Sequence, residues 1–209
     1  MATNMIFYTH PLSRGRMVRW MLEEIGRPYT TELLDFGSTV KSPAYVAINP
    51  MGKVPAIKHG DVVVTETPAI IAYLADAFPE AGLAPPFGSP MRGAYYRWLF
   101  FASGPAEQTI VAQACGWSVP EGRGGFVGFS VMPVLLDTIE GAIKGHDYIV
   151  GDSFTAADLY LAAQLGWGMF IGSIEKRPAF EDYVGRMSQR PASVRAREID
   201  DRLLAEARR

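Results

Sequence analysis

The 209 residues of this chain are 48% hydrophobic and 20% charged, which is enough apolar material for one large domain or two small ones. The formal net charge of −2 lacks the basic excess that nucleic-acid binding requires. No apolar run reaches the ~18 residues that are needed to span a bilayer. We therefore predict a soluble globular protein that binds neither nucleic acid nor membrane.

Cysteine usage indicates a reducing compartment. Cys115 is the single cysteine, so no intramolecular disulfide can form, and no Cys or His spacing resembles a zinc site. The start of the chain lacks the basic segment and long apolar run of a secretory signal. These features predict a cytoplasmic protein without a metal, in which Cys115 is a buried apolar side chain of a helix.

The first 34 residues predict a strand, a helix and a second strand. Residues 5–8 are an apolar run followed by turn-forming residues, which predicts a buried strand. Residues 13–25 carry apolar side chains at helical spacing, and Gly26 and Pro28 end that pattern. Residues 29–34 predict the next strand, which the helical crossover pairs in parallel with the first.

A hairpin and a helix follow. Residues 54–57 and 62–65 are rich in β-forming residues and are joined by a turn that contains glycine, which predicts a hairpin. Thr67 and Pro68 then provide an N-cap and a proline at the first position of a helix that continues over 69–77. The resulting order, β-α-β followed by β-β-α, is that of an α/β domain.

The rest of the chain is predicted to be helical. Residues 79–90 are rich in proline and glycine, which indicates an irregular linker. We therefore expect three parts: an α/β domain over residues 1–78, that linker, and an all-α domain over residues 91–209.

Two features of the helical part lead to definite expectations. Pro105 interrupts a helical pattern over residues 91–115, and we expect a kink near Ser103, since proline lacks the N–H that bonds back one turn. Thr155 caps a later helix, and Asp158 lies three residues further on, where its side chain can reach back to the cap.

Four segments carry a resemblance to a known family. They are YTHPLS at residues 8–13, NPMGKVPAI at 49–57, ETPAIIAYL at 66–74 and GDSFTAADLYLA at 151–162. In these segments, and in their order, the sequence resembles the cytosolic glutathione transferases. The resemblance implies a thioredoxin-like α/β domain that binds glutathione as co-substrate, an all-α domain with a hydrophobic substrate pocket, and a homodimer.

The γ-glutamyl end of glutathione has a candidate site at Glu66 and Thr67. A hydroxyl and free amide hydrogens lie there at a helix N-terminus, where the dipole favours a carboxylate. Similar proteins bind the γ-glutamyl group at this point, usually with serine where Thr67 stands, and Glu66 can accept hydrogen bonds from its ammonium. The structural alternative is an ordinary helix cap beside a charge.

Residues at the start of the strand predicted over 54–57 are candidates for contacts with the central amide and the glycyl end of glutathione. The resemblance implies a cis peptide between Val54 and Pro55, which turns the Val54 backbone toward the cysteinyl amide. Lys53, and also Lys41, can pair with the glycyl carboxylate. A trans proline that starts a strand and two solvated lysines are the structural alternatives.

Ser13 is the first candidate for ionising the glutathione thiol. A free thiol has a pKa of about 8.5, so only about 3% is thiolate at pH 7. In similar enzymes a serine at this point donates to the thiolate, and such a bond together with the helix dipole lowers the thiol pKa by about two units. Tyr8 is the rival donor, because other branches of the family use a tyrosine at the end of the first strand. The structural alternatives are a serine that only caps the helix and a half-buried tyrosine.

Side chains of the helical domain are candidates for lining a cleft for an apolar electrophile. We expect most of them to lie in the core instead, because aromatic residues at helical spacing usually do. The candidates are Tyr95, Trp98, Phe100, Phe101, Trp117, Trp167, Met169 and Phe170.

The resulting prediction is a glutathione transferase whose thiolate attacks an electrophilic carbon or a peroxide. Branches of the family that use a cysteine in the loop after the first strand are excluded, because residues 9–14 contain none. The alternative is a glutathione-transferase-like protein that binds ligands or partners with weak or no catalysis. A glutathione-dependent dehalogenase or lyase on the same scaffold is a third possibility.

Overall fold

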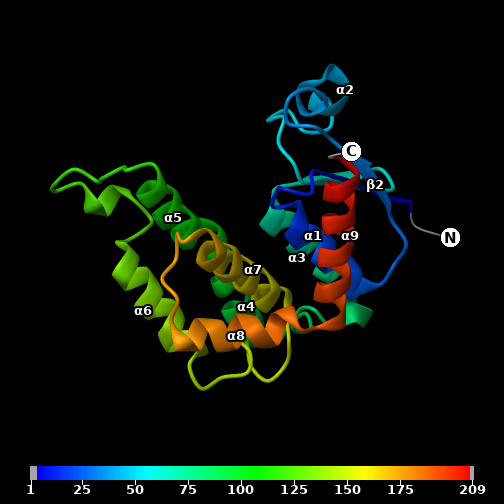
Figure 1. Ribbon diagram of the computed structural model, residues 1–209. Coiled ribbons are helices and arrows are strands. Elements are labelled where there is room, and N and C mark those ends of the chain that lie inside the picture. The colour runs from blue at the N-terminus through cyan, green and yellow to red at the C-terminus, as the bar shows by residue number, and fades with distance from the viewer. Residues whose placement is uncertain (1–3, 208–209) are drawn as a thin grey trace. The chain divides into compact units, whose positions relative to one another are not determined.

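The computed structural model describes residues 4–207 in two compact units. The first unit runs up to Gly82 and takes in the chain again from Gln189, and the second is Leu83–Ser188. Figure 1 shows the course of the chain from blue to red.

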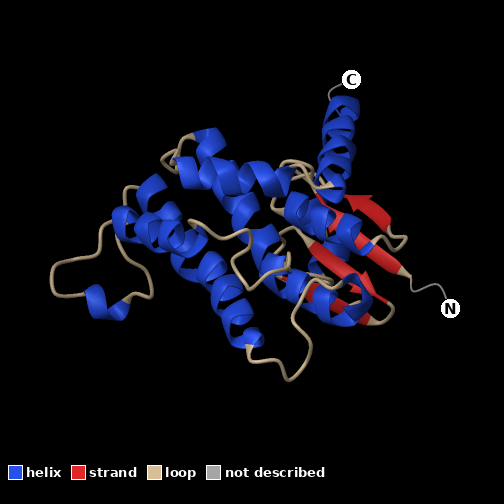
Figure 2. Cartoon of the chain, turned by 90° about the horizontal axis from the view of Figure 1, so that it is seen from below, coloured by secondary structure: helices blue, strands red, loops and turns tan. Residues whose placement is uncertain are grey.

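A four-stranded sheet organises the first unit. Its strands are β1 (Met5–Thr9), β2 (Thr30–Leu33), β3 (Ala56–His59) and β4 (Val62–Thr65), in the spatial order β2-β1-β3-β4. The pair β1 and β2 is parallel, and the other two pairs are antiparallel (Figure 2). The predicted thioredoxin-like arrangement is confirmed.

The helices of this unit are α1 (Gly15–Ile25), the short α2 (Pro43–Val46), α3 (Thr67–Ala77) and α9 (Pro191–Ala207). Helices α1 and α3 contact each other, and both contribute buried side chains to the core. The fully buried apolar side chains of this core include Phe7, Val18, Met21, Ile57, Ile70, Ile71 and Leu74.

The last helix packs with the first unit. The sequence analysis assigned residues 91–209 to one helical domain, but α9 lies along α1 (Figure 1). A buried ion pair between Arg19 and Asp200, with Nε and Oδ1 2.6 Å apart, ties the two helices together. The predicted domain limits at residues 78 and 90 remain a prediction, and a 3₁₀ turn at Pro79–Ala81 opens the expected linker.

The second unit is helical throughout. A π-helical turn at Ala102–Ala106 contains Pro105, so the α-helical pattern changes where the sequence places the proline, while the kink near Ser103 stays a prediction. The other helices of the unit are α4 (Met91–Phe101), α5 (Glu107–Ala114), α6 (Met132–Ile143), α7 (Ala156–Ile171) and α8 (Pro178–Ser188).

The start of α7 is held by a buried carboxylate. Thr155 and Asp158 form the predicted capping box, in which Asp158 accepts hydrogen bonds from the backbone and the hydroxyl of Thr155 at 2.9 and 2.8 Å. Asp158 also accepts from the Ile149 amide and the Tyr183 hydroxyl. Burial raises the pKa of the Asp158 carboxyl, while the four donors oppose that shift.

The prediction of a buried Cys115 is wrong. The helix α5 ends at Ala114, and Cys115 is exposed at the beginning of the segment that leads to α6. Trp117 and Phe126 of the same segment are 69% and 79% exposed. These three side chains are therefore not part of a packed core. The residue type of Cys115 alone did not predict its burial correctly.

Candidate glutathione site

The register of the sheet brings the predicted glutathione contacts to one edge. Tyr8 pairs with Ala56, and Ala56 pairs with Thr65, so the three residues form a row across β1, β3 and β4. Pro55 directly precedes this row and Thr67 follows it by two residues. The loop after β1, the start of β3 and the start of α3 therefore meet at the same edge of the sheet.

The peptide between Val54 and Pro55 is cis, which confirms the expectation from the resemblance. The segment before it is anchored at the Lys53 carbonyl, which accepts from the Tyr45 hydroxyl at 2.6 Å and from the Asn49 side-chain amide at 2.7 Å. Burial raises the pKa of Tyr45 to about 12, so its hydroxyl keeps the proton that it donates.

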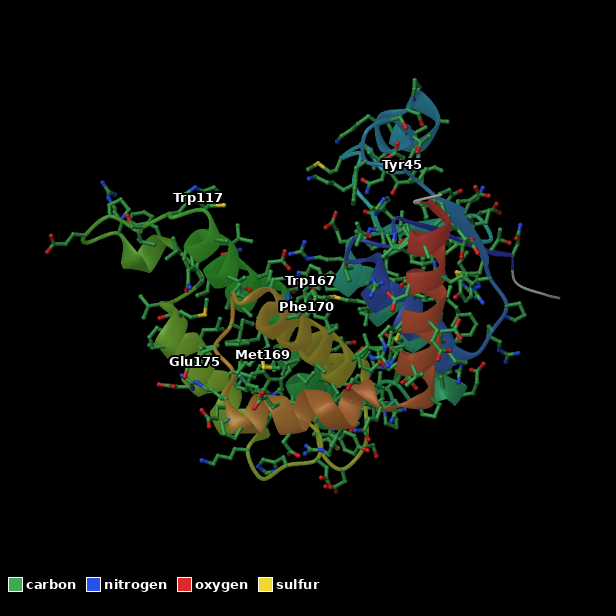
Figure 3. The ribbon with its side chains drawn as sticks, in the orientation of Figure 1. Tyr45, Trp117, Trp167, Met169, Phe170 and Glu175 are labelled. Atoms are coloured by element: carbon green, nitrogen blue, oxygen red, sulfur yellow. The ribbon has the colours of Figure 1, made fainter. Side chains whose placement is uncertain are left out.

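The sequence patterns did not indicate that Tyr45 and Asn49 hold the Lys53 carbonyl at this site. Asn49 entered the sequence analysis only as the first residue of the NPMGKVPAI segment, and Tyr45 lies in a stretch with no chemical motif. Both side chains are buried, and Tyr45, which belongs to α2, is labelled in Figure 3. A buried tyrosine and asparagine near the NP turn are the pattern that could have indicated their role.

The N-terminus of α3 differs in one detail from the prediction. Thr67 is the first residue of the helix and is buried, whereas Glu66 takes the N-cap position and makes no cap bond with its side chain. Glu66 has a φ of 68°, a left-handed conformation that is uncommon outside glycine. The predicted cap by Thr67 is therefore wrong by one residue. A non-glycine residue in that conformation is typical of functional positions.

The two lysines meet at one turn. Lys41 donates through Nζ to the carbonyls of Met51 and Gly52 at 3.2 and 2.9 Å. Both Lys41 and Lys53 are exposed, and Lys53 directly follows this turn. The geometry makes Lys41 a brace for the turn and leaves Lys53 as the better placed of the two for a carboxylate.

Gly52 allows the lysine brace to form. Its φ is +56°, and a Cβ built there would lie 2.9 Å from both Cδ and Nζ of Lys41. Only a residue without a side chain accommodates this approach.

Ser13 is bonded within its own loop. Its hydroxyl donates to the His10 carbonyl at 2.7 Å and accepts from the Gly15 amide at 2.9 Å. The helix α1 begins at Gly15 and Arg14 occupies the N-cap position, so the predicted cap at Ser13 is wrong by one residue, although the Ser13 oxygen still satisfies a first-turn amide.

The Ser13 hydroxyl can change its acceptor at small energetic cost. The His10 carbonyl also accepts the Ser13 backbone N–H at 2.9 Å, so it stays hydrogen-bonded if the hydroxyl turns away. A serine carries one hydroxyl proton, and an incoming thiolate is a stronger acceptor than a neutral carbonyl. The loop is therefore suited to donate that proton to a sulfur.

Tyr8 remains the rival donor. It is half-buried, and its ring lies 5.7 Å from that of Tyr45. Burial, with a smaller effect from Glu32, raises the pKa of Tyr8, so its phenol stays protonated at neutral pH. A protonated phenol can donate to a thiolate, as can the hydroxyl of Ser13.

The apolar candidates divide into buried and exposed groups, and the expectation that most of them lie in the core is wrong. Tyr95 and Trp98 are buried, whereas Phe101 and Met169 are half-buried. Trp167 and Phe170 lie together near the end of α7 with ring centroids 5.7 Å apart (Figure 3). The exposed members of the set are Phe100, Trp117, Trp167 and Phe170.

Comparison with known proteins decides the family. Residues 13–77 match the family described as glutathione S-transferase, N-terminal domain, and residues 131–191 match glutathione S-transferase, C-terminal domain. The crystal structure of a glutathione transferase from Methylococcus capsulatus is 31% identical, with a TM-score of 0.79, over 94% of this chain and 98% of that one. The chain belongs to the glutathione S-transferase family.

Other relatives agree with this assignment. Glutathione S-transferase GstA of Escherichia coli O157:H7 is 29% identical over 88% of this chain and 90% of its own length. A sphingomonad glutathione S-transferase solved in complex with glutathione is 27% identical, with a TM-score of 0.75, over 94% of this chain and 98% of that one. This glutathione transferase is therefore an enzyme with glutathione as co-substrate, and the alternative of a binding protein without catalysis is not favoured.

No group of three or more His, Cys, Asp or Glu side chains in residues 4–207 is arranged to hold a metal ion. None of the helices in the same range combines the length and the apolar character that crossing a bilayer requires.

Proposed function

We propose that this glutathione transferase joins the glutathione thiolate to hydrophobic electrophiles and that Ser13 is the residue that stabilises the thiolate. The main support is the hydrogen bonding of Ser13. Its hydroxyl proton points to a carbonyl that retains a second donor, so the proton is available to a sulfur at that edge of the sheet.

The rest of glutathione is assigned along the same edge. The γ-glutamyl group lies at Glu66 and Thr67, where the first amides of α3 attract a carboxylate. The Val54 backbone pairs with the cysteinyl amide, and Lys53 pairs with the glycyl carboxylate. Lys41 acts on that last contact indirectly, because it holds the turn before Lys53.

The hydrogen bond from Ser13 is expected to lower the pKa of the glutathione thiol. A charge-assisted hydrogen bond of about 1.5 to 3 kcal/mol and a dipole contribution of about 0.5 kcal/mol together lower the thiol pKa by about two units. The thiolate fraction at pH 7 then rises from about 3% to about three quarters. Tyr8 is retained as the alternative donor.

We further propose a homodimer. Phe87, Tyr96 and Phe100 are exposed, and the last two lie four residues apart on one face of α4. The Arg92 guanidinium lies 4.0 Å from the centre of the Phe87 ring. An exposed face of aromatic and arginine side chains is typical of protein interfaces, and a second copy of the chain is its expected partner. The cytoplasm is the expected location.

The test is turnover of a chlorodinitrobenzene-type substrate and of a hydroperoxide by the wild type, Ser13→Ala and Tyr8→Phe. The expected result is loss of activity in Ser13→Ala and near wild-type activity in Tyr8→Phe. The opposite result would assign thiol activation to Tyr8. Calorimetric titration of each variant with glutathione separates loss of binding from loss of thiol activation.

A further inference from the structure

Two neighbouring acidic residues of α9 face two arginines of α1. Arg16 pairs with Asp201, and Arg19 pairs with Asp200. Arg16 and Arg19 are three residues apart and therefore lie on the same face of α1. The two pairs differ in burial, since both members of the Arg19 pair are 1% exposed, whereas Arg16 and Asp201 are 32% and 57% exposed.

Arg16 also contacts the loop that carries Ser13. Its Nε donates to the Pro11 carbonyl at 2.7 Å, while Nη2 of the same guanidinium donates to Asp201. One rigid planar group therefore joins the loop after β1 to the last helix of the chain.

The position of Ser13 depends on this loop. The Leu12 amide donates to Nδ1 of His10 at 3.1 Å, and the His10 ring lies 4.1 Å from that of Phe36. His10 and Ser13 are the two ends of the turn, and Pro11 lies between them. The Pro11 carbonyl is thus the point at which the first turn of α1, through the Arg16 side chain, holds the turn.

We propose that Arg16 positions Ser13 for thiol activation by holding the Pro11 carbonyl, and that Asp201 in turn holds Arg16. Helix α9 then contributes, through Asp201, to ionisation of the glutathione thiol. The inference rests on the proposed role of Ser13. Arg16 is a positioning residue here, because it acts on the sulfur through the loop.

The rival explanation is that Arg16 acts by its charge alone. The two explanations predict opposite effects of Asp201→Ala. Removal of a carboxylate makes the local potential more positive, which by charge alone lowers the pKa of a nearby thiol. Loss of the support for Arg16 loosens the turn and raises that pKa, because the Ser13 hydroxyl is then less well placed to donate.

Asp201 is a better target than Asp200. The Arg19 and Asp200 pair is buried, and removing one partner would leave an unpaired charge that can unfold the protein. Asp201 is more than half exposed, so its loss is tolerated. The pair of Arg27 and Glu80 in the same unit, 57% and 56% exposed, provides a matched control in Glu80→Ala.

The experiment measures the pKa of enzyme-bound glutathione from thiolate absorbance against pH, together with kcat and KM. In Arg16→Ala and Asp201→Ala we expect the thiol pKa to rise by about one unit, which is about a tenfold loss of thiolate below that pKa. KM for glutathione should stay within about twofold of the wild-type value. Arg16→Lys keeps the charge but lacks Nε, and it should behave like Arg16→Ala. Glu80→Ala should match the wild type.

The outcomes also separate this inference from the role of Ser13. A lower or unchanged thiol pKa in Asp201→Ala, or wild-type behaviour of Arg16→Lys, overturns the positioning role whatever Ser13→Ala does. If Ser13→Ala leaves the pKa unchanged while Arg16→Ala raises it, the serine assignment fails and Arg16 positions another donor of the loop. If both proposals hold, adding Arg16→Ala to Ser13→Ala raises the pKa no further.

Discussion

The two compact units hold their buried polar groups in different ways. In the first unit, hydrogen bonds fix backbone carbonyls at a sheet edge, as at Lys53, and an ion pair of Arg19 and Asp200 is buried between helices. In the second unit, one carboxylate, Asp158, gathers four donors at the start of α7, while several aromatic side chains remain exposed. The unit that we propose to bind glutathione thus has backbone carbonyls fixed by side-chain hydrogen bonds, and the other unit exposes apolar side chains.

The largest expected effect concerns Asp158, the buried carboxylate at the start of α7 in the second unit. Asp158→Ala leaves the Ile149 and Thr155 amides and two hydroxyls without their acceptor, so we expect a loss of about 3 kcal/mol in the free energy of unfolding. Denaturant unfolding measures it. Asp182→Ala, which removes a 70% exposed partner of Arg186, is the control and should change stability by less than about 0.5 kcal/mol. Similar losses in both variants would contradict the central role of Asp158.

The next effect concerns the sheet edge of the first unit. Ser13→Ala should lower turnover at pH 7 by about 25-fold, because the thiolate fraction falls from about three quarters to about 3%. The free energy of unfolding should fall by about 1 kcal/mol, because the Gly15 amide loses the Ser13 hydroxyl as its acceptor while the His10 carbonyl keeps a backbone donor. The pH profile of kcat should shift upward by about two units, and an unshifted profile would remove Ser13 from the mechanism.

A smaller effect is expected at the exposed aromatic pair of the second unit. Phe170→Ala should raise KM for an apolar electrophile about threefold and change stability by less than about 0.5 kcal/mol. Phe126→Ala is the matched control, because both side chains are 79% exposed. Equal KM values in the two variants would mean that exposure of an aromatic ring does not by itself mark the electrophile site.

The smallest effect is a pH dependence of stability in the first unit. Burial raises the pKa of the Asp200 carboxyl above 3.8, with the charge of Arg19 acting against that shift. A carboxyl with a higher pKa in the folded state binds its proton more tightly there, so its contribution to stability is greatest below 3.8 and declines as the pH rises through the folded pKa. An NMR titration of the Asp200 carboxyl in the folded wild type should therefore give a pKa above 3.8. A pKa at or below 3.8 would contradict the shift.

Features that depend on neighbouring residues in the chain were predicted well. The capping box of Thr155 and Asp158 uses residues three apart, and the interruption at Pro105 follows from one missing N–H. The strands of the first unit were also predicted close to their observed limits. Local hydrogen-bonding needs decide these elements before any tertiary contact forms.

Features that depend on distant residues were predicted poorly. Lys41 braces a turn ten residues away, and Cys115 is exposed at the end of a helix whose last two residues are exposed as well. No pattern around these residues indicates which surface or carbonyl lies opposite them. The same holds for α9, whose packing against α1 was missed.

The amino-acid sequence by itself determined the order of elements, the family resemblance, and Ser13, Val54 and Thr67 as candidates for contacts with glutathione, because each rests on a short stretch of chain. Only the tertiary structure decided that these stretches meet at one sheet edge and that Arg16 joins the serine loop to Asp201. The physical reason is that strand register and helix packing set which side chains meet across almost two hundred residues of chain, and these arise when the whole core is buried.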